Sequence, residues 1–163
     1  MVCRRVSTAD PVAPAADISD DFVRLFQELE PRLRRALMAA RGVEVGREAT
    51  AEAFAWGWEH RRELAEIDAP LSYLYRVGLS RVRRRKVRLP WVSSTWHEPW
   101  IEPELGTALR SLSERQRVSV VLVHGYGWTL AEVGALLGLK ATTVQNHVER
   151  GLSRLRSHLG GDD

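Results

Sequence analysis

Residues 129–155 read TLAEVGALLGLKATTVQNHVERGLSRL, and this stretch decides the fold of the C-terminal part of the chain. Thr129, followed three residues later by Glu132, has the pattern of a helix N-terminal capping box. Gly138 then interrupts the helical period, because glycine readily takes the left-handed conformation that ends a helix. The stretch therefore predicts two helices joined by a glycine turn, which is the arrangement of a helix-turn-helix.

Apolar residues recur at steps of three and four in both helices, so each helix has one inner face. The second helix is expected to span Thr142 to Leu155. The inner residues of the first helix are Leu130, Val133, Leu136 and Leu137, and those of the second are Val144, Val148, Leu152 and Leu155. The residues expected to contact DNA are Lys140, Thr142, Thr143, Gln145, Asn146, Glu149 and Arg150. Gln and Asn can pair bidentately with adenine, and Arg with guanine. We therefore expect the second helix to enter the major groove, with His147 in a packing or phosphate-contacting role.

Two more helices are predicted upstream of this motif. The first spans about Glu104 to Leu112, and Ser113 with Gln116 forms a capping box for the next. That next helix is expected to stop at Gly125 in a left-handed conformation. The residues expected to be buried in it or to cover its end are Val118, Val121, Leu122, Tyr126 and Trp128.

The N-terminal half predicts a bundle of three helices. The first begins at Asp21, and Pro31 is expected to kink or divide it; its apolar stripe is Phe22, Leu25, Phe26, Leu29, Leu33 and Leu37. The second spans about Gly46 to Leu64, with an inner face of Ala49, Ala53, Phe54 and Trp58. The third opens at Pro70, and its apolar positions are Leu71, Leu74, Tyr75, Gly78, Leu79 and Val82.

The third helix ends in a run of basic residues, Arg81, Arg83, Arg84, Arg85, Lys86 and Arg88. No acidic residue occurs between Asp68 and Glu98 to neutralise this run. A solvated helix end is one interpretation, because positive charge is favoured at a helix C-terminus. Phosphate binding is the interpretation that we favour, because guanidinium groups grip phosphate bidentately.

Proline and tryptophan positions divide the chain into parts. Residues 1–18 contain two prolines and no aromatic residue, which indicates a flexible leader. Residues 89–103 indicate a linker that packs on the chain's own domains or docks in a partner's cleft, since they hold the prolines and tryptophans Pro90, Trp91, Trp96, Pro99, Trp100 and Pro103. The expected fold class is therefore all-α: two small helical domains, residues 19–88 and 104–163, are joined by a Pro/Trp-containing linker, and the C-terminal one is a helix-turn-helix.

Composition is that of a basic globular protein. The 163 residues carry 24 Lys and Arg against 21 Asp and Glu, which gives a formal net charge of +3. The one cysteine, Cys3, allows no intramolecular disulfide and favours a reducing compartment. No signal peptide or membrane-spanning run is visible, so we expect a cytoplasmic protein without membrane insertion.

No residue pattern indicates an active site, a metal or a cofactor, so we expect a protein that is not an enzyme. The histidines show no ligand spacing with cysteines or carboxylates, and there is no phosphate-binding glycine loop or nucleophile motif. A metal-dependent nuclease using Glu48 and Glu52, which share one helix face, is a minor alternative. Two glutamates without a further carboxylate or histidine nearby rarely make a catalytic site.

The order of these parts resembles an extracytoplasmic-function (ECF) sigma factor, a compact bacterial RNA polymerase initiation factor, over about residues 20–160. Residues 128–139 and 143–152 look like the family's region four. Residues similar to region two in type and order are Glu48, Ala51, Glu52, Phe54 and Trp58, followed by residues 73–78 and the basic run. Response-regulator-like proteins share the C-terminal pattern but have no segment like region two.

The resemblance implies a protein that directs core RNA polymerase to promoters. The residues implied to bind polymerase are Glu48, Glu52 and Phe54. Those implied to face promoter DNA near the start site are Arg76, Ser80, Arg81, Arg83, Arg84, Arg85 and Lys86. Region four would read the more distant promoter element, and an anti-sigma factor is left open as a further partner.

Two departures from the family's pattern bear on these implied roles, whereas a third, Ala51 in place of a common Gln, leaves the helix undisturbed. Ser80 stands where many members have Asn near the melted strand, so a helix-turn-helix regulator that does not melt promoters is an alternative. Lys140 replaces a Ser that usually caps the recognition helix. Thr142 or Thr143 is then expected to supply the cap.

Overall fold

The protein is seen in a computed structural model that describes residues 15–82 and 103–160. Every regular element in these ranges is helical, which confirms the predicted all-α class. The N-terminal elements are α1 (Ala15–Arg41), α2 (Val43–Glu59), α3 (Arg61–Ala65) and α4 (Pro70–Arg81). The C-terminal elements are α5 (Pro103–Ser111), α6 (Glu114–Val120), the π-helical segment η1 (Val121–Gly125), α7 (Leu130–Leu137) and α8 (Ala141–Leu159).

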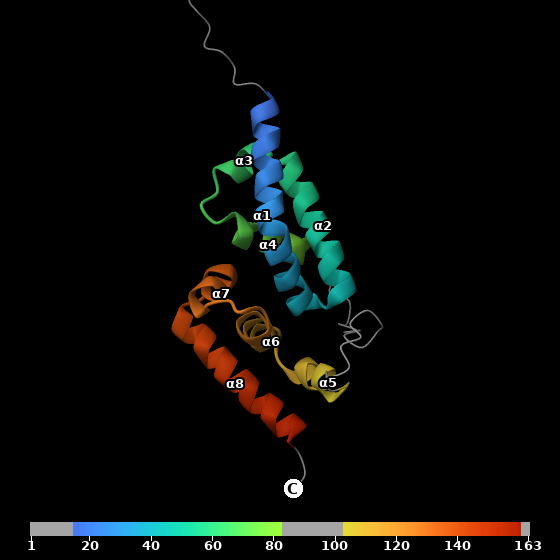
Figure 1. Ribbon diagram of the computed structural model, residues 1–163, viewed down its shortest axis with the longest axis vertical. Coiled ribbons are helices and arrows are strands. Elements are labelled where there is room, and N and C mark those ends of the chain that lie inside the picture. The colour runs from blue at the N-terminus through green and yellow to red at the C-terminus, as the bar shows by residue number, and fades with distance from the viewer. Residues whose placement is uncertain (1–14, 83–102, 161–163) are drawn as a thin grey trace, which may run out of the picture.

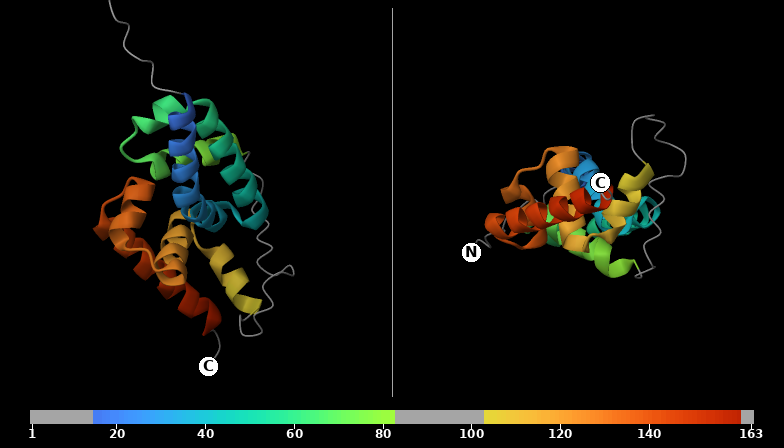
Figure 2. Two further views of the ribbon diagram at one scale, coloured as in Figure 1. Left: turned by 45° about the horizontal axis from the view of Figure 1, so that its top comes forward. Right: turned by 90° about the horizontal axis from the view of Figure 1, so that it is seen from below.

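The two groups of helices lie at opposite ends of the molecule, as Figure 1 and the left view of Figure 2 show. α1 and α2 pack side by side with α4 against both, and α8 packs against α5, α6 and α7. The groups also contact each other, α6 against α1 and α7 against α4. In Figure 1, α7 consequently lies between α8 and the N-terminal helices.

Close packing of the N-terminal helices depends on glycine. A Cβ at Gly46 would lie 2.6 Å from the Met38 Cα and N, and one at Gly78 would lie 2.8 Å from the Ala49 carbonyl oxygen. The helices can approach so closely only because no side chain intervenes. This approach buries Leu33, Leu37 and Leu74 completely.

The N-terminal helices differ from the sequence-based expectation in three ways. α1 begins at Ala15, inside the range predicted as leader, and Pro31 does not divide it. The second predicted helix is two helices, α2 and α3, which meet at His60. Trp58 is 45% exposed and does not belong to the inner face.

Both predicted capping boxes are present in the C-terminal group. The Ser113 and Thr129 side chains each accept the N3 backbone N–H, and the N3 side chains of Gln116 and Glu132 accept the N–H of the cap. Gly138 has φ 68°, which is the predicted left-handed turn. These local signals were readable because each pairing involves residues only three apart.

Two predicted helix ends in this group are wrong. Gly125 is not left-handed, because the helix continues from α6 through η1, and a left-handed glycine follows two residues later at Gly127, with φ 69°. α8 begins at Ala141 with Lys140 at the N-cap and no side-chain cap hydrogen bond. Thr142 and Thr143 therefore lie inside the helix and do not cap it. The predicted linker and its tryptophans, like the basic run from Arg83 to Arg88, lie outside the described residues apart from Pro103, which opens α5.

Candidate nucleic-acid interface

The recognition helix α8 is fixed by its turn. The Leu139 N–H donates to the Gly134 carbonyl at 2.8 Å, and a Cβ on Gly134 would lie 2.6 Å from the Leu139 carbonyl oxygen. On the inner side of α8, Val144 is fully buried and Val148 and Leu155 are nearly so. Packing of these residues fixes which face of α8 is buried, and so it also fixes which face is exposed to solvent.

The outer face of α8 presents most of the residues predicted to contact DNA. Thr143 is half-buried, and the exposed ones are Lys140, Thr142, Gln145, Asn146, Glu149 and Arg150. The Gln145 amide donates to the Glu149 carboxylate at 3.0 Å, one turn further along. This contact pre-orders the Gln145 amide, which must exchange the carboxylate for a base edge in order to read it.

His147 lies beside this face in a basic environment. Its pKa is lowered, first by desolvation and then by the nearby charges of Arg115 and Arg150. The two nearby arginines make the surroundings of His147 basic, which suits the predicted contact with a DNA phosphate.

The region-two residues that the structure describes lie on the exposed side of α4. The Arg76 guanidinium sits 5.8 Å above the Tyr73 ring, and the Ser80 hydroxyl donates to the Val77 carbonyl at 2.8 Å. Arg81 forms an ion pair of 3.7 Å with Glu52 of α2. The structure therefore brings Arg76, Ser80 and Arg81 onto one helix, while Arg83, Arg84, Arg85 and Lys86 lie outside the described residues.

The three residues predicted to bind polymerase do not share one surface. Glu48 and Glu52 are exposed on α2. Phe54 is only 6% exposed, because its ring packs edge-on against Phe26 with centroids 4.6 Å apart. Phe54 therefore holds α2 against α1 and offers little surface in this state, and its role in polymerase binding stays a prediction.

Sequence reasoning missed the arginines that join the two groups of helices. Arg117 of α6 is 6% exposed and donates to backbone carbonyls of α1. A charged residue directly before the apolar run VSVVLV was a signal that could have indicated a buried arginine. Its acceptors lie 77 and 78 residues away, so the sequence could not have identified them.

This geometry is that of a helix-turn-helix joined to a second helical unit. Residues 103–155 match the family described as Sigma-70, region 4. A segment of 64 residues is 38% identical to the ECF RNA polymerase sigma factor SigE of Mycolicibacterium smegmatis, and it covers 39% of this chain. The chain spans 25% of the length of that relative.

The fold is similar to that of the sigma factor RpoE from Bartonella quintana, which was solved in complex with the anti-sigma factor NepR. The TM-score is 0.59 at 15% sequence identity, over 88% of this chain and 99% of that chain. The region 4 match and the segment similar to SigE confirm the predicted resemblance to ECF sigma factors, and the fold agrees with them. The resemblance is carried by sequence in the C-terminal unit and by fold in both units.

The described part of the chain has neither a membrane-spanning helix nor a cluster of metal ligands. Its helices include none that is both long and apolar enough to cross a membrane. Its His, Cys, Asp and Glu side chains nowhere gather in threes as a metal site would require.

Proposed function

We propose that the chain is an ECF-type RNA polymerase sigma factor, which directs core polymerase to promoters and supports transcription initiation. The observation that carries the proposal is a capped helix-turn-helix that matches sigma-70 region 4. This motif is joined to a second helical unit, and the two units together have a fold similar to that of a solved sigma factor. A regulator that does not melt promoters is not favoured, because such a protein has no need of the N-terminal unit.

In this proposal the two units have different tasks. α8 reads the more distant promoter element through Gln145, Asn146 and Arg150, whose exposure supports this role. The exposed residues of α4, together with the basic run that follows it, hold the element near the start site. The proposed units are residues 19–88 and 104–163 with a linker between them, and α1 extends the first unit back to Ala15, into the range predicted as leader.

The proposed partners are core RNA polymerase and promoter DNA. An anti-sigma factor is a further proposed partner, because the protein of similar fold was solved with one. We propose a cytoplasmic protein that catalyses no reaction of its own and needs no metal or cofactor. Its effect on transcription then comes entirely from binding.

Polymerase binding can be tested by retention of purified core RNA polymerase on the immobilised full chain. Glu48→Ala with Glu52→Ala is expected to weaken retention, because both carboxylates are exposed on the face of α2 proposed to dock. Glu63→Ala on α3 with Glu66→Ala at its C-cap is the matched control, since both carboxylates are exposed and the charge change is equal. A wild-type chain that retains no core polymerase would contradict the proposal.

A further inference from the structure

Helices α6 and α8 cross so closely that the crossing fixes where the side chains beside it lie. A Cβ on Gly151 of α8 would lie 2.7 Å from the Cγ2 of Val120 and 3.6 Å from the Cβ of Gln116, both on α6. The Arg154 guanidinium donates to the Gln116 side-chain oxygen at 3.1 Å, and the same oxygen accepts the Ser113 N–H at 3.2 Å. The middle of α8 is therefore tied to the first turn of α6.

This crossing brings three basic side chains from two helices together. On α6, Arg115 directly precedes Gln116. On α8, Arg150 directly precedes Gly151, and His147 lies one turn before it. The charges of Arg115 and Arg150 both act on the imidazole of His147, and in the described part of the chain no acidic group is among the charges that do. Arg115, His147 and Arg150 therefore form a basic cluster that spans α6 and α8.

The two arginines of the basic cluster are not neutralised within the part of the chain that the structure describes. Both are exposed, and neither guanidinium forms a hydrogen bond, ion pair or ring contact there. The acids nearest to them in sequence have other partners. Glu114 pairs with Arg41 of α1 at 3.4 Å, and Glu149 accepts a hydrogen bond from its own helix at 3.0 Å. Like charges held together in this way repel each other, and a bound anion would remove that repulsion.

The position of the basic cluster favours a DNA phosphate as this anion. Arg150 belongs both to the cluster and to the face of α8 predicted to contact DNA, and the exposed Asn146 directly precedes His147. A helix in the major groove has a phosphate backbone along each side, and basic side chains at the edge of its reading face meet that backbone. Arg115 lies at this edge but on α6, so it is placed beside the groove and not within it.

We propose that Arg115 of α6 is a further DNA-contacting residue, which binds one backbone phosphate together with His147 and Arg150 at the edge of the groove that α8 occupies. The DNA interface then extends beyond the helix-turn-helix to the helix that precedes it. This contact positions α8 without reading sequence, because a phosphate carries no base identity. The inference rests on the proposed function, in which α8 binds a promoter element.

The salt dependence of DNA binding tests the contact. The full chain first selects its preferred duplex from a random pool, and affinities for that duplex and for a scrambled one are then measured over a series of salt concentrations. Arg115→Ala should weaken binding to both duplexes by the same factor and reduce the magnitude of the slope of log affinity against log salt by about 0.9. Because Arg115 is exposed, this change should leave the fold intact.

Two further variants are the controls. Arg115→Lys should keep most of the slope, since an ammonium group also binds phosphate. Arg62→Ala removes an exposed arginine from α3 and should keep the wild-type slope. Equal slopes for Arg115→Ala and Arg62→Ala would overturn the contact, and so would a wild-type chain that binds no duplex even at the lowest salt concentration.

A scan of neutral phosphates identifies the contact directly. In each duplex of the scan, one phosphate near the preferred sequence is replaced by an uncharged methylphosphonate. One replacement should weaken binding of the wild type and have little effect on Arg115→Ala, because the two changes remove the same interaction. If every replacement weakens both proteins equally, Arg115 contacts no phosphate and the basic cluster is left for an acidic protein partner, which overturns the proposal.

The contact and the proposed function can fail separately. The binding measurements use no polymerase, and transcription by the wild-type chain with core polymerase is scored in its own experiment. Transcription together with an unchanged slope for Arg115→Ala would reject the contact alone. A reduced slope without any transcription would reject the sigma function alone.

Discussion

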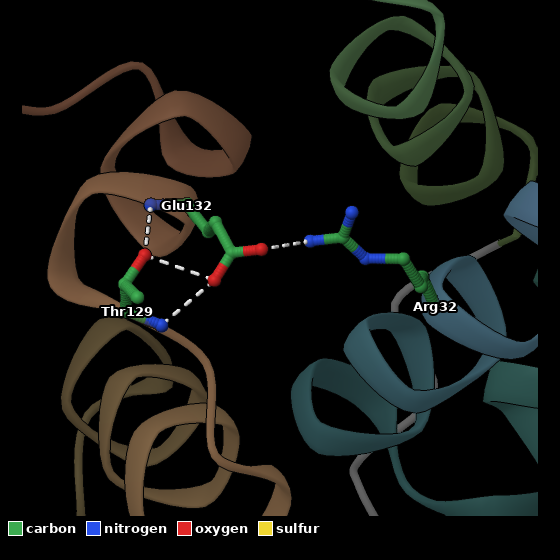
Figure 3. Close-up of polar contacts among 3 residues, drawn as sticks. All are labelled: Arg32, Thr129 and Glu132. Carbon is green, nitrogen blue, oxygen red and sulfur yellow. Dashed lines mark hydrogen bonds and ion pairs between the residues drawn. The ribbon is translucent and has the colours of Figure 1, made fainter.

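Glu132 connects the N-terminus of its own helix, α7, to α1 through one carboxylate (Figure 3). It accepts the Thr129 N–H, the Thr129 hydroxyl and the Arg32 guanidinium at 2.8 to 2.9 Å. These contacts lower the pKa of Glu132, with the backbone hydrogen bond from Thr129 as the largest cause. A group this exposed contributes little to overall stability, but its titration is a specific probe of the contact.

The first prediction concerns this titration. Because the folded pKa of Glu132 lies below that of the unfolded chain, its contribution to stability is present above pH 4.5 and is lost as the pH falls through the lowered value. Urea unfolding from pH 7 to pH 3 should show this loss in the wild type. Glu132→Gln should lack that part of the profile. Identical pH profiles for the two proteins would contradict the assignment.

A second prediction at residue scale concerns base reading by α8. Gln145→Ala and Arg150→Ala should each cost about 1–3 kcal/mol on the preferred promoter element and relax its sequence preference. The measurement is binding to the preferred duplex and to single-base variants of it. An equal loss on every sequence would indicate phosphate contacts in place of base contacts.

Among the C-terminal helices, α8 lacks the side-chain N-cap hydrogen bond that α6 and α7 have. The backbone at Lys140 has φ −71° and ψ 148°, close to the −72° and 155° of Thr129, but Lys140 makes no side-chain cap hydrogen bond. Lys140→Ser should therefore stabilise the protein by about 0.5–2 kcal/mol, because the backbone already has the geometry of a serine cap. Thermal unfolding of Lys140→Ser and the wild type measures the change in stability. A lower melting temperature for the variant would contradict the prediction and show that the Lys140 side chain stabilises the fold.

The packing of α1 against α2 gives the fourth prediction. Gly46→Ala should destabilise the protein by about 1–3 kcal/mol, because the new methyl group would collide with the backbone of Met38. Gly125→Ala is the control, since its Cβ would meet only the Val121 side chain at 3.9 Å. Unfolding in denaturant compares the two variants. Equal effects would mean that the helices are less closely packed than described.

Helix signals that depend on neighbouring residues were predictable, and those that depend on packing were not. Both capping boxes and the Gly138 turn follow from residues at most three apart. Because the helix continues from α6 through η1, the left-handed glycine is Gly127 and not the predicted Gly125. No local sequence pattern indicates such a π-helical turn. Helical periodicity placed Phe54 and Trp58 on one inner face, whereas the packing buries the first and exposes the second.

For the whole molecule, the sequence predicted two helical units but not how they meet. The predicted site on α8 rested on residue type and helical face, and the site on α4 rested on the resemblance to region two. The DNA-facing residues of both helices are exposed or half-buried where the structure describes them. The contacts of Arg32 and Arg117 join residues at least 77 positions apart. Such contacts come from tertiary packing, so they were outside the reach of pattern analysis.

Transcription in vitro tests the central claim most directly. Purified core RNA polymerase would be combined with the full chain and a library of randomised promoter-length templates, and the transcripts would be sequenced. The proposed sigma function predicts transcripts that begin at a fixed distance from an enriched sequence motif and that require the chain. No transcripts above those of core polymerase alone, while the chain still binds duplex DNA, would contradict it.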